Sequence, residues 1–175
     1  MDFSKFKTSD WLIVGGGVLT LIGGLFLDWI NFGVSFSDGN AFDFTLTGAL
    51  PWLLVIAATV ITVLLILEKL DAKAQPWPLI LLGGTSFAAL LLLIRVVFNP
   101  GIGGEASRGT GMLLTFVAAL IATAGAVLNY QASGGELSDL TDMDKLKASF
   151  SGSGKDGGSD KPPPAAADTP PPPPQ

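Results

Sequence analysis

The sequence predicts an all-α polytopic membrane protein, built as a bundle of four transmembrane helices. Long apolar runs, a scarcity of charge, and the positions of lysine and tryptophan lead to this fold class. The apolar runs cover about residues 11–30, 48–67, 79–98 and 111–130. Each is close to the ~20 residues that a helix needs to cross the hydrocarbon core of a bilayer. None carries the polar stripe that is typical of a helix in a soluble protein.

Composition agrees with this fold class and excludes several functions. The chain has 175 residues, of which 49% are hydrophobic and 14% are charged; about a quarter would be charged in a soluble domain. It contains no cysteine and no histidine, so thiolate chemistry and the commonest metal ligand and acid–base group are missing. We therefore expect no cofactor, no metal and no enzymatic activity. The net charge of −5, without a basic stripe, argues against nucleic acid as a partner.

The distribution of lysine and tryptophan predicts the orientation. Lysines lie before the first run, between the second and third, and after the fourth, whereas residues 31–47 contain none. Because positive residues favour the cytoplasmic side, we expect a multi-pass protein with both termini in the cytoplasm. A signal peptide is the alternative interpretation of the first run, but no small-x-small cleavage site follows it. Tryptophans mark the ends of the runs, as in an aromatic belt: Trp11, Trp29, Trp52 and Trp77.

The chain divides into four parts. Residues 1–10 form a cytoplasmic N-terminus, and residues 11–130 form the transmembrane domain. Residues 131–150 contain a candidate amphipathic cytoplasmic helix, with a mostly disordered linker as the alternative. Residues 151–175 are rich in glycine and serine and then in proline, so we expect a disordered tail. The candidate helix presents an apolar face for a partner or the membrane surface: Leu137, Leu140, Met143 and Leu146.

Two charged residues fall within the apolar runs. Asp28 lies 17 residues after Trp11, and Arg95 lies 17 residues after Pro78. At about 1.5 Å per residue, both would reach a depth of ~25 Å, near the outer hydrocarbon boundary. Since a charge at this depth costs free energy, we predict that Asp28 and Arg95 form an intramembrane polar pair. The alternative is that each side chain extends separately to the outer headgroups.

Small residues recur at four-residue spacing, which allows helices to approach closely. They predict faces for packing within the bundle, and self-association is the alternative. The second run is the exception, because its bulky aliphatic side chains favour contact with lipid. The candidate packing residues are Gly16, Thr20, Gly24, Gly83, Gly84, Gly111, Thr115 and Ala119.

Four spans, short acidic outer loops, a glycine-rich approach to the fourth span at residues 107–111 and a proline-rich tail occur together in this chain. In this architecture the chain resembles small actinobacterial membrane proteins of unknown function. The resemblance implies a bacterial plasma membrane and an accessory role, and it assigns no functional residue.

These features predict a non-enzymatic membrane scaffold or an accessory subunit of a larger membrane complex. The tail is then a candidate segment for binding a cytoplasmic partner, with a passive spacer as the alternative. The alternative is a small transporter or channel component that acts as an oligomer. Against this alternative, no apolar run is interrupted at its midpoint, as the binding-site helices of many transporters are. The expected partners are the lipid bilayer and either another membrane protein or further copies of the same chain.

Overall fold

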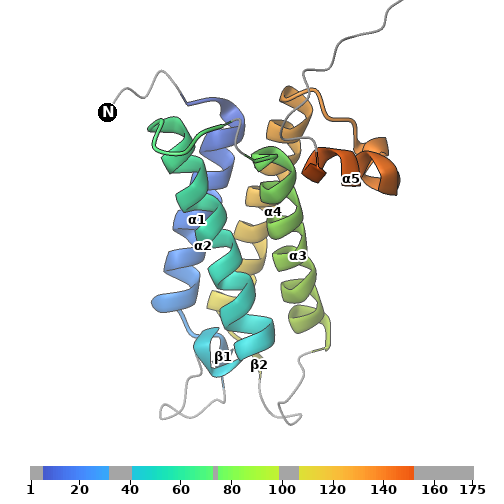
Figure 1. The fold of residues 1–175 in the computed structure, drawn as a ribbon. Helices are drawn as coiled ribbons and strands as arrows, with labels where there is room; N and C mark the ends of the chain where they lie inside the picture. Colours follow the sequence, from blue (N-terminus) through green and yellow to red (C-terminus); the bar gives the residue numbers. More distant parts are fainter. Residues whose placement is uncertain (1–5, 32–40, 73–74, 99–106, 152–175) are drawn as a thin grey trace, which may run out of the picture.

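Four long helices run side by side and form an antiparallel bundle (Figure 1). They are α1 (Thr8–Leu25), α2 (Leu50–Ile66), α3 (Trp77–Phe98) and α4 (Thr110–Ala132). The π-helical turn η3 (Thr45–Ala49) precedes α2 and forms one span with it. The computed structural model describes residues 6–31, 41–72, 75–98 and 107–151. All four spans are long and apolar enough to cross a membrane, which confirms the predicted all-α polytopic fold.

The ends of α1 differ from the predicted span. The helix begins at Thr8, before the apolar run, and Asp10 in its first turn accepts a hydrogen bond from the backbone N–H of Lys7 at 3.0 Å. This bond satisfies a donor that the helix itself leaves without an acceptor. The helix already ends at Leu25, so residues up to 29 form a turn rather than a final helical segment. The depth of these residues cannot be counted along a helix axis.

The most extensive interface joins α1 to α4. Their backbones approach so closely that side chains are excluded at several positions. A Cβ atom at Gly16 would lie 2.7 Å from the carbonyl oxygen of Ala118, and one at Gly125 would lie 2.7 Å from that of Ser9. Since such distances essentially never occur for real Cβ atoms, glycine sets the separation of these two helices.

The helix α2 packs against the other side of α1, and α3 packs against both α2 and α4. Gly17 lies against Thr59, whose hydroxyl donates to the carbonyl oxygen of Ile13 at 3.3 Å. Gly24 lies against the indole of Trp52. Of the four spans, the one containing α2 has the lowest buried share, 28% against 44% in each other span. This agrees with the expectation that the second run has the most contact with lipid.

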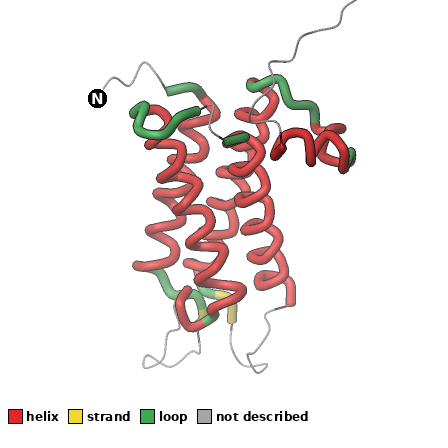
Figure 2. The backbone as a smooth tube through the Cα atoms, viewed as in Figure 1, coloured by secondary structure: helices red, strands yellow, loops and turns green. Residues whose placement is uncertain are grey.

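The two ends of the bundle differ. The end that carries the start of α1 and the end of α4 is called the terminal end here. At the opposite end, β1 (Ile30–Asn31) pairs antiparallel with β2 (Ser107–Arg108), and this is called the strand end (Figures 1 and 2). A short 3₁₀ turn, η2 (Ala41–Asp43), packs against η3 at the strand end.

After α4 the chain forms the 3₁₀ helix η4 (Leu137–Thr141) and the helix α5 (Met143–Ser151). The continuous amphipathic helix predicted within 131–150 is therefore broken. The break falls at Asp142, whose backbone is extended, with φ −96° and ψ 103°. Of the tail expected to be disordered, residues 151–175, Ser151 ends α5 and residues 152–175 lie outside the described residues, as do residues 1–5 of the predicted N-terminal segment.

Candidate functional site

Trp29 forms the centre of the strand end. Its side chain is fully buried, and its indole N–H donates to the carbonyl oxygen of Gly23 at 3.0 Å. The backbone around it is also bonded to the start of α4. The N–H of Gly109 donates to the carbonyl oxygen of Trp29, and that of Gly111 donates to the carbonyl oxygen of Asp28, both at 2.9 Å. Buried polar groups are thus satisfied where the chain turns back into the bundle.

Arg95 is the buried charge of the strand end. Its side chain is 1% exposed, and its guanidinium carbon lies 3.6 Å from the centroid of the Phe44 ring. This is the geometry of a cation–π contact, in which the ring face attracts the positive charge. Phe44 lies between η2 and η3, so the contact ties the segment before α2 to α3.

The structure places the two members of the predicted pair, Asp28 and Arg95, in different surroundings. The structure buries Arg95 inside the bundle, whereas the side chain of Asp28 is exposed. The prediction placed Asp28 on the last turn of a helix. In the turn after Leu25, the neighbouring Trp29 is buried instead.

Sequence reasoning missed the role of Arg108. Its Nε atom donates to the carbonyl oxygen of Val96 at 2.6 Å, and its Nη2 atom donates to that of Val97 at 3.3 Å. A helix leaves its last carbonyls without partners, and a cation near them is favourable. Arg108, which lies on β2, therefore supplies hydrogen-bond donors to the last carbonyl groups of α3. An arginine just before an apolar run gives no hint of which helix end it reaches.

The structure places most candidate packing residues inside the bundle. A Cβ at Gly111 would lie 2.5 Å from the carbonyl oxygen of Leu27. Gly83 and Gly84 are the exceptions, because a Cβ atom at either would have no heavy atom within 4 Å among the described residues. They form an adjacent glycine pair like Gly23 and Gly24 of α1, but they lie on a face of α3 that no other span covers. The buried candidates are Gly16, Thr20, Gly24, Gly111, Thr115 and Ala119.

Three glycines that the spacing rule did not single out prove equally close to a neighbouring helix. Gly23 faces Thr115, Gly17 faces Thr59, and Gly125 faces the first turn of α1. Gly17 and Gly23 stand next to selected glycines in the same runs. The sequence shows that α1 is rich in glycine, but it does not show that α1 packs between two helices and uses two faces.

The terminal end contains a pocket of about 460 Å³ between the ends of the four long helices. One side of the pocket is polar. Asn129 on α4 donates to Asp10 Oδ1 on α1 at 3.2 Å. The lining from α2 and α3 is mostly apolar and includes Leu65 and Leu81, with Thr62 as a polar member. Because Asp10 also accepts the backbone N–H of Lys7, its carboxylate links α1 to α4.

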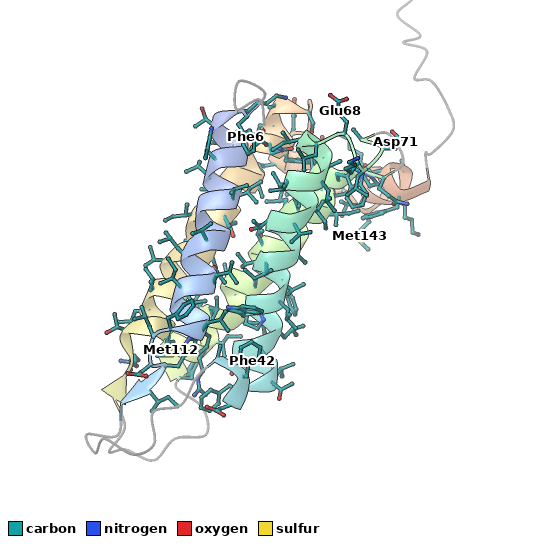
Figure 3. All side chains as sticks on the ribbon, turned by 90° about the vertical axis from the view of Figure 1, so that its left-hand side faces the viewer. Phe6, Phe42, Glu68, Asp71, Met112 and Met143 are labelled. Atoms are coloured by element: carbon teal, nitrogen blue, oxygen red, sulfur yellow. The ribbon has the colours of Figure 1, made fainter. Side chains whose placement is uncertain are left out.

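Figure 3 shows the contrast between the two ends in side-chain detail. Phe42 and Met112 lie at the strand end, whereas Glu68, Asp71 and Met143 lie at the terminal end. Met112 is fully buried, and Phe42 makes an edge-on contact with the Trp52 ring at a centroid distance of 5.2 Å. Within the part of the chain that the structure describes, no group of three or more potential metal ligands gathers.

The segment after α4 folds back onto the bundle. Leu140 packs against the buried cluster that contains Leu81 and Ala126. Lys145 Nζ lies 2.6 Å from Asp139 Oδ1 and joins α5 to η4. The hydrogen bond from Lys145 lowers the pKa of Asp139, and the same bond raises the pKa of Lys145. Of the predicted apolar face, Met143 and Leu137 are exposed, and Leu140 and Leu146 are half-buried.

No family model, curated protein or solved structure matches this chain. Its function is therefore inferred from the geometry described above.

Proposed function

We propose that this protein is a non-enzymatic membrane scaffold or an accessory subunit of a larger membrane complex. The observation that supports this most directly is the contrast between the bundle and the segment that follows it. The bundle buries most of its candidate packing residues within itself, whereas the last residues of the chain are too rich in proline to form a core. The bundle thus supplies position in the membrane, and the proline-rich tail supplies a surface for a partner.

The tight packing of α1 supports a structural role. Its glycines approach α4 on one side and α2 on the other, so little room remains along the axis of the bundle. Trp52 donates its indole N–H to the carbonyl oxygen of Thr20 at 3.0 Å and fills the space beside Gly24. A single copy built in this way is suited to a fixed shape rather than to alternating access.

The proline-rich tail is the proposed partner-binding segment. Residues 161–175 contain eight prolines in two runs. A polyproline segment is extended before binding and loses little conformational entropy when it docks in an aromatic groove. The expected partner is therefore a cytoplasmic protein with such a groove, acting together with a membrane-protein partner of the bundle.

A small transporter or channel component is the second candidate, and the pocket at the terminal end favours it. This pocket combines the Asp10–Asn129 contact with an apolar wall, as a vestibule for a small solute would. In this alternative, several copies would have to form the path, because α1 and α4 close the interior of one copy.

The test compares three full-length or truncated chains, purified in mild detergent after crosslinking in cells. The first is the natural chain, the second has the eight tail prolines replaced by serine, and the third lacks residues 136–175. We expect the serine variant to lose a defined set of crosslinked cytoplasmic proteins while it keeps the thermal stability of the bundle. If all three chains were crosslinked to the same set of cytoplasmic proteins, the proposal that the tail binds a partner would be refuted. Transport by vesicles that contain the third chain would favour the alternative.

We further propose that the protein lies in a bacterial plasma membrane with both termini in the cytoplasm. The lysine distribution supports this orientation. Because the chain contains no cysteine, single cysteines can report on it without background labelling. An impermeant thiol reagent added to intact cells should label Ser37→Cys and Ala106→Cys. Labelling of Ala72→Cys or Ser159→Cys instead would reverse the orientation.

A further inference from the structure

We propose that α5 lies in the surface of the bilayer leaflet at the terminal end, with Met143, Leu146 and Phe150 inserted among the lipids. This goes beyond the scaffold function, because it assigns the face to lipid rather than to a protein.

The position of α5 relative to the spans is the first observation. Figure 1 shows α5 beside the terminal ends of α3 and α4 rather than beyond them, and lying across the direction of the long helices. When the four spans cross a bilayer, a helix at this depth and in this direction lies at the boundary between the headgroups and the acyl chains. Its apolar face therefore continues the lipid-facing surface of the bundle.

The arrangement of residues on α5 is the second observation. Met143, Leu146 and Phe150 follow one another at spacings of three and four residues, so they share one face of the helix. Met143 is 72% exposed and Phe150 is 60% exposed, so the protein itself leaves them uncovered. Side chains this large and apolar gain free energy when lipid replaces water around them.

The charged residues of the segment fit the same orientation. Lys147 follows Met143 by four residues and therefore borders the apolar face, from where its amine can reach lipid phosphates. Lys145 lies farther round the helix and is paired with Asp139. Lys147 thus borders the apolar face, while the more distant Lys145 is already held by a carboxylate.

The attachment of the segment is the third observation. Leu140 packs against the buried cluster that contains Leu81 and Ala126, and the Asp139–Lys145 pair joins η4 to α5. These contacts hold α5 beside the bundle at a set height. Insertion of its apolar face then requires little further ordering of the chain, which lowers the entropic cost of binding the surface.

The experiment uses single cysteines in the full chain, which has no cysteine of its own. Met143→Cys and Phe150→Cys place a nitroxide label on the apolar face. Ala148→Cys is the matched control, because Ala148 is exposed and lies two residues from both Leu146 and Phe150, on the opposite face. Each labelled protein is reconstituted in phosphatidylcholine vesicles with and without phosphatidylglycerol. Electron paramagnetic resonance then measures collisions with oxygen, which enters the bilayer, and with a nickel chelate, which stays in water.

We expect oxygen collisions to exceed nickel collisions several-fold at positions 143 and 150, and the reverse at position 148. High nickel accessibility at all three positions would show that α5 stays in water and would overturn the proposal. Low accessibility to both reagents at 143 and 150 would show that protein covers the face, as a second copy or another chain, and would also overturn it. Neither result depends on whether the proline-rich tail binds a partner, so the scaffold function is tested separately.

Discussion

The strand end and the terminal end of the bundle are packed in different ways. At the strand end, Trp29 and Arg95 are almost completely buried, and backbone hydrogen bonds join β1 to the start of α4. At the terminal end, a pocket of about 460 Å³ separates the helices, and the Asp10–Asn129 contact crosses it at one side. Among the described residues, the strand end is closely packed and joined by backbone hydrogen bonds, whereas the terminal end contains a pocket.

The difference shows how one bundle can combine a fixed shape with an accessible surface. Close glycine contacts continue along α1 and α4, so the openness of the terminal end does not come from loose packing of this pair. The pocket lies where α2 and α3 border this pair, and Thr62, Leu65 and Leu81 are among its lining residues. Substitutions at the two ends should therefore differ in their effect on stability.

The largest effect is expected for Trp29→Ala. The change removes a fully buried ring and its hydrogen bond to Gly23, and truncation of a buried aromatic residue costs about 3 to 5 kcal/mol. Unfolding of the purified protein by increasing SDS in mild detergent measures the loss. Trp11→Ala is the control, because Trp11 is 48% exposed and should lose about 1 kcal/mol, the value of its contact with Phe6. Equal losses would mean that the strand end does not dominate stability.

The next effect concerns the closeness of α1 and α4. Gly111→Val should destabilise the bundle by about 3 kcal/mol, because any Cβ there meets the carbonyl oxygens of Gly23 and Leu27. Gly83→Val introduces the same side chain into a helix where a Cβ would have no heavy atom within 4 Å among the described residues. It should change the free energy of unfolding little. If both variants unfold at the same SDS concentration, the interface between α1 and α4 is not as tight as the structure shows.

A smaller effect is expected at the terminal end. Asp10→Ala and Asn129→Ala each remove one partner of the 3.2 Å hydrogen bond, and a bond to a charged group contributes about 2 kcal/mol. The double variant should lose less than the sum, with a coupling of about 1 kcal/mol. Strictly additive losses in the same SDS titration would show that Asp10 acts through Lys7 alone and does not link the two helices.

The smallest effect concerns the contact between η4 and α5. The pKa of Asp139 is lowered. The charged carboxylate therefore stabilises the contact between η4 and α5 fully above the ordinary pKa of an aspartate, and this stabilisation is lost as the pH falls through the lowered pKa. Because the pKa of Lys145 is raised, its contribution is lost only as the pH rises through the raised value. We expect a nitroxide at position 148 to become more mobile on acidification from neutral pH. The same acidification of a Lys145→Gln variant should change mobility little, and an equal change would assign the effect to other carboxylates.

The residue types within short stretches of the sequence were enough to predict the helices of this protein and the close packing of two of them. The length and apolarity of the four runs determined the number and kind of helices, because a backbone in hydrocarbon must satisfy its hydrogen bonds within each segment. The abundance of small residues in α1 and α4 likewise predicted close packing, and the structure pairs these two helices. Such properties belong to single segments and need no knowledge of neighbours.

Which face of each helix meets a neighbour was decided only by the tertiary structure. Gly83 and Gly16 have similar sequence surroundings, yet Gly16 touches α4 and Gly83 faces away from the other spans. The turn after Leu25 likewise exposes Asp28 and buries Trp29, while Arg95 lies over Phe44 from a distant segment. In uniformly apolar helices, the sequence carries no polar stripe to mark the buried side, so the partners of each face are fixed by the packing of the whole bundle.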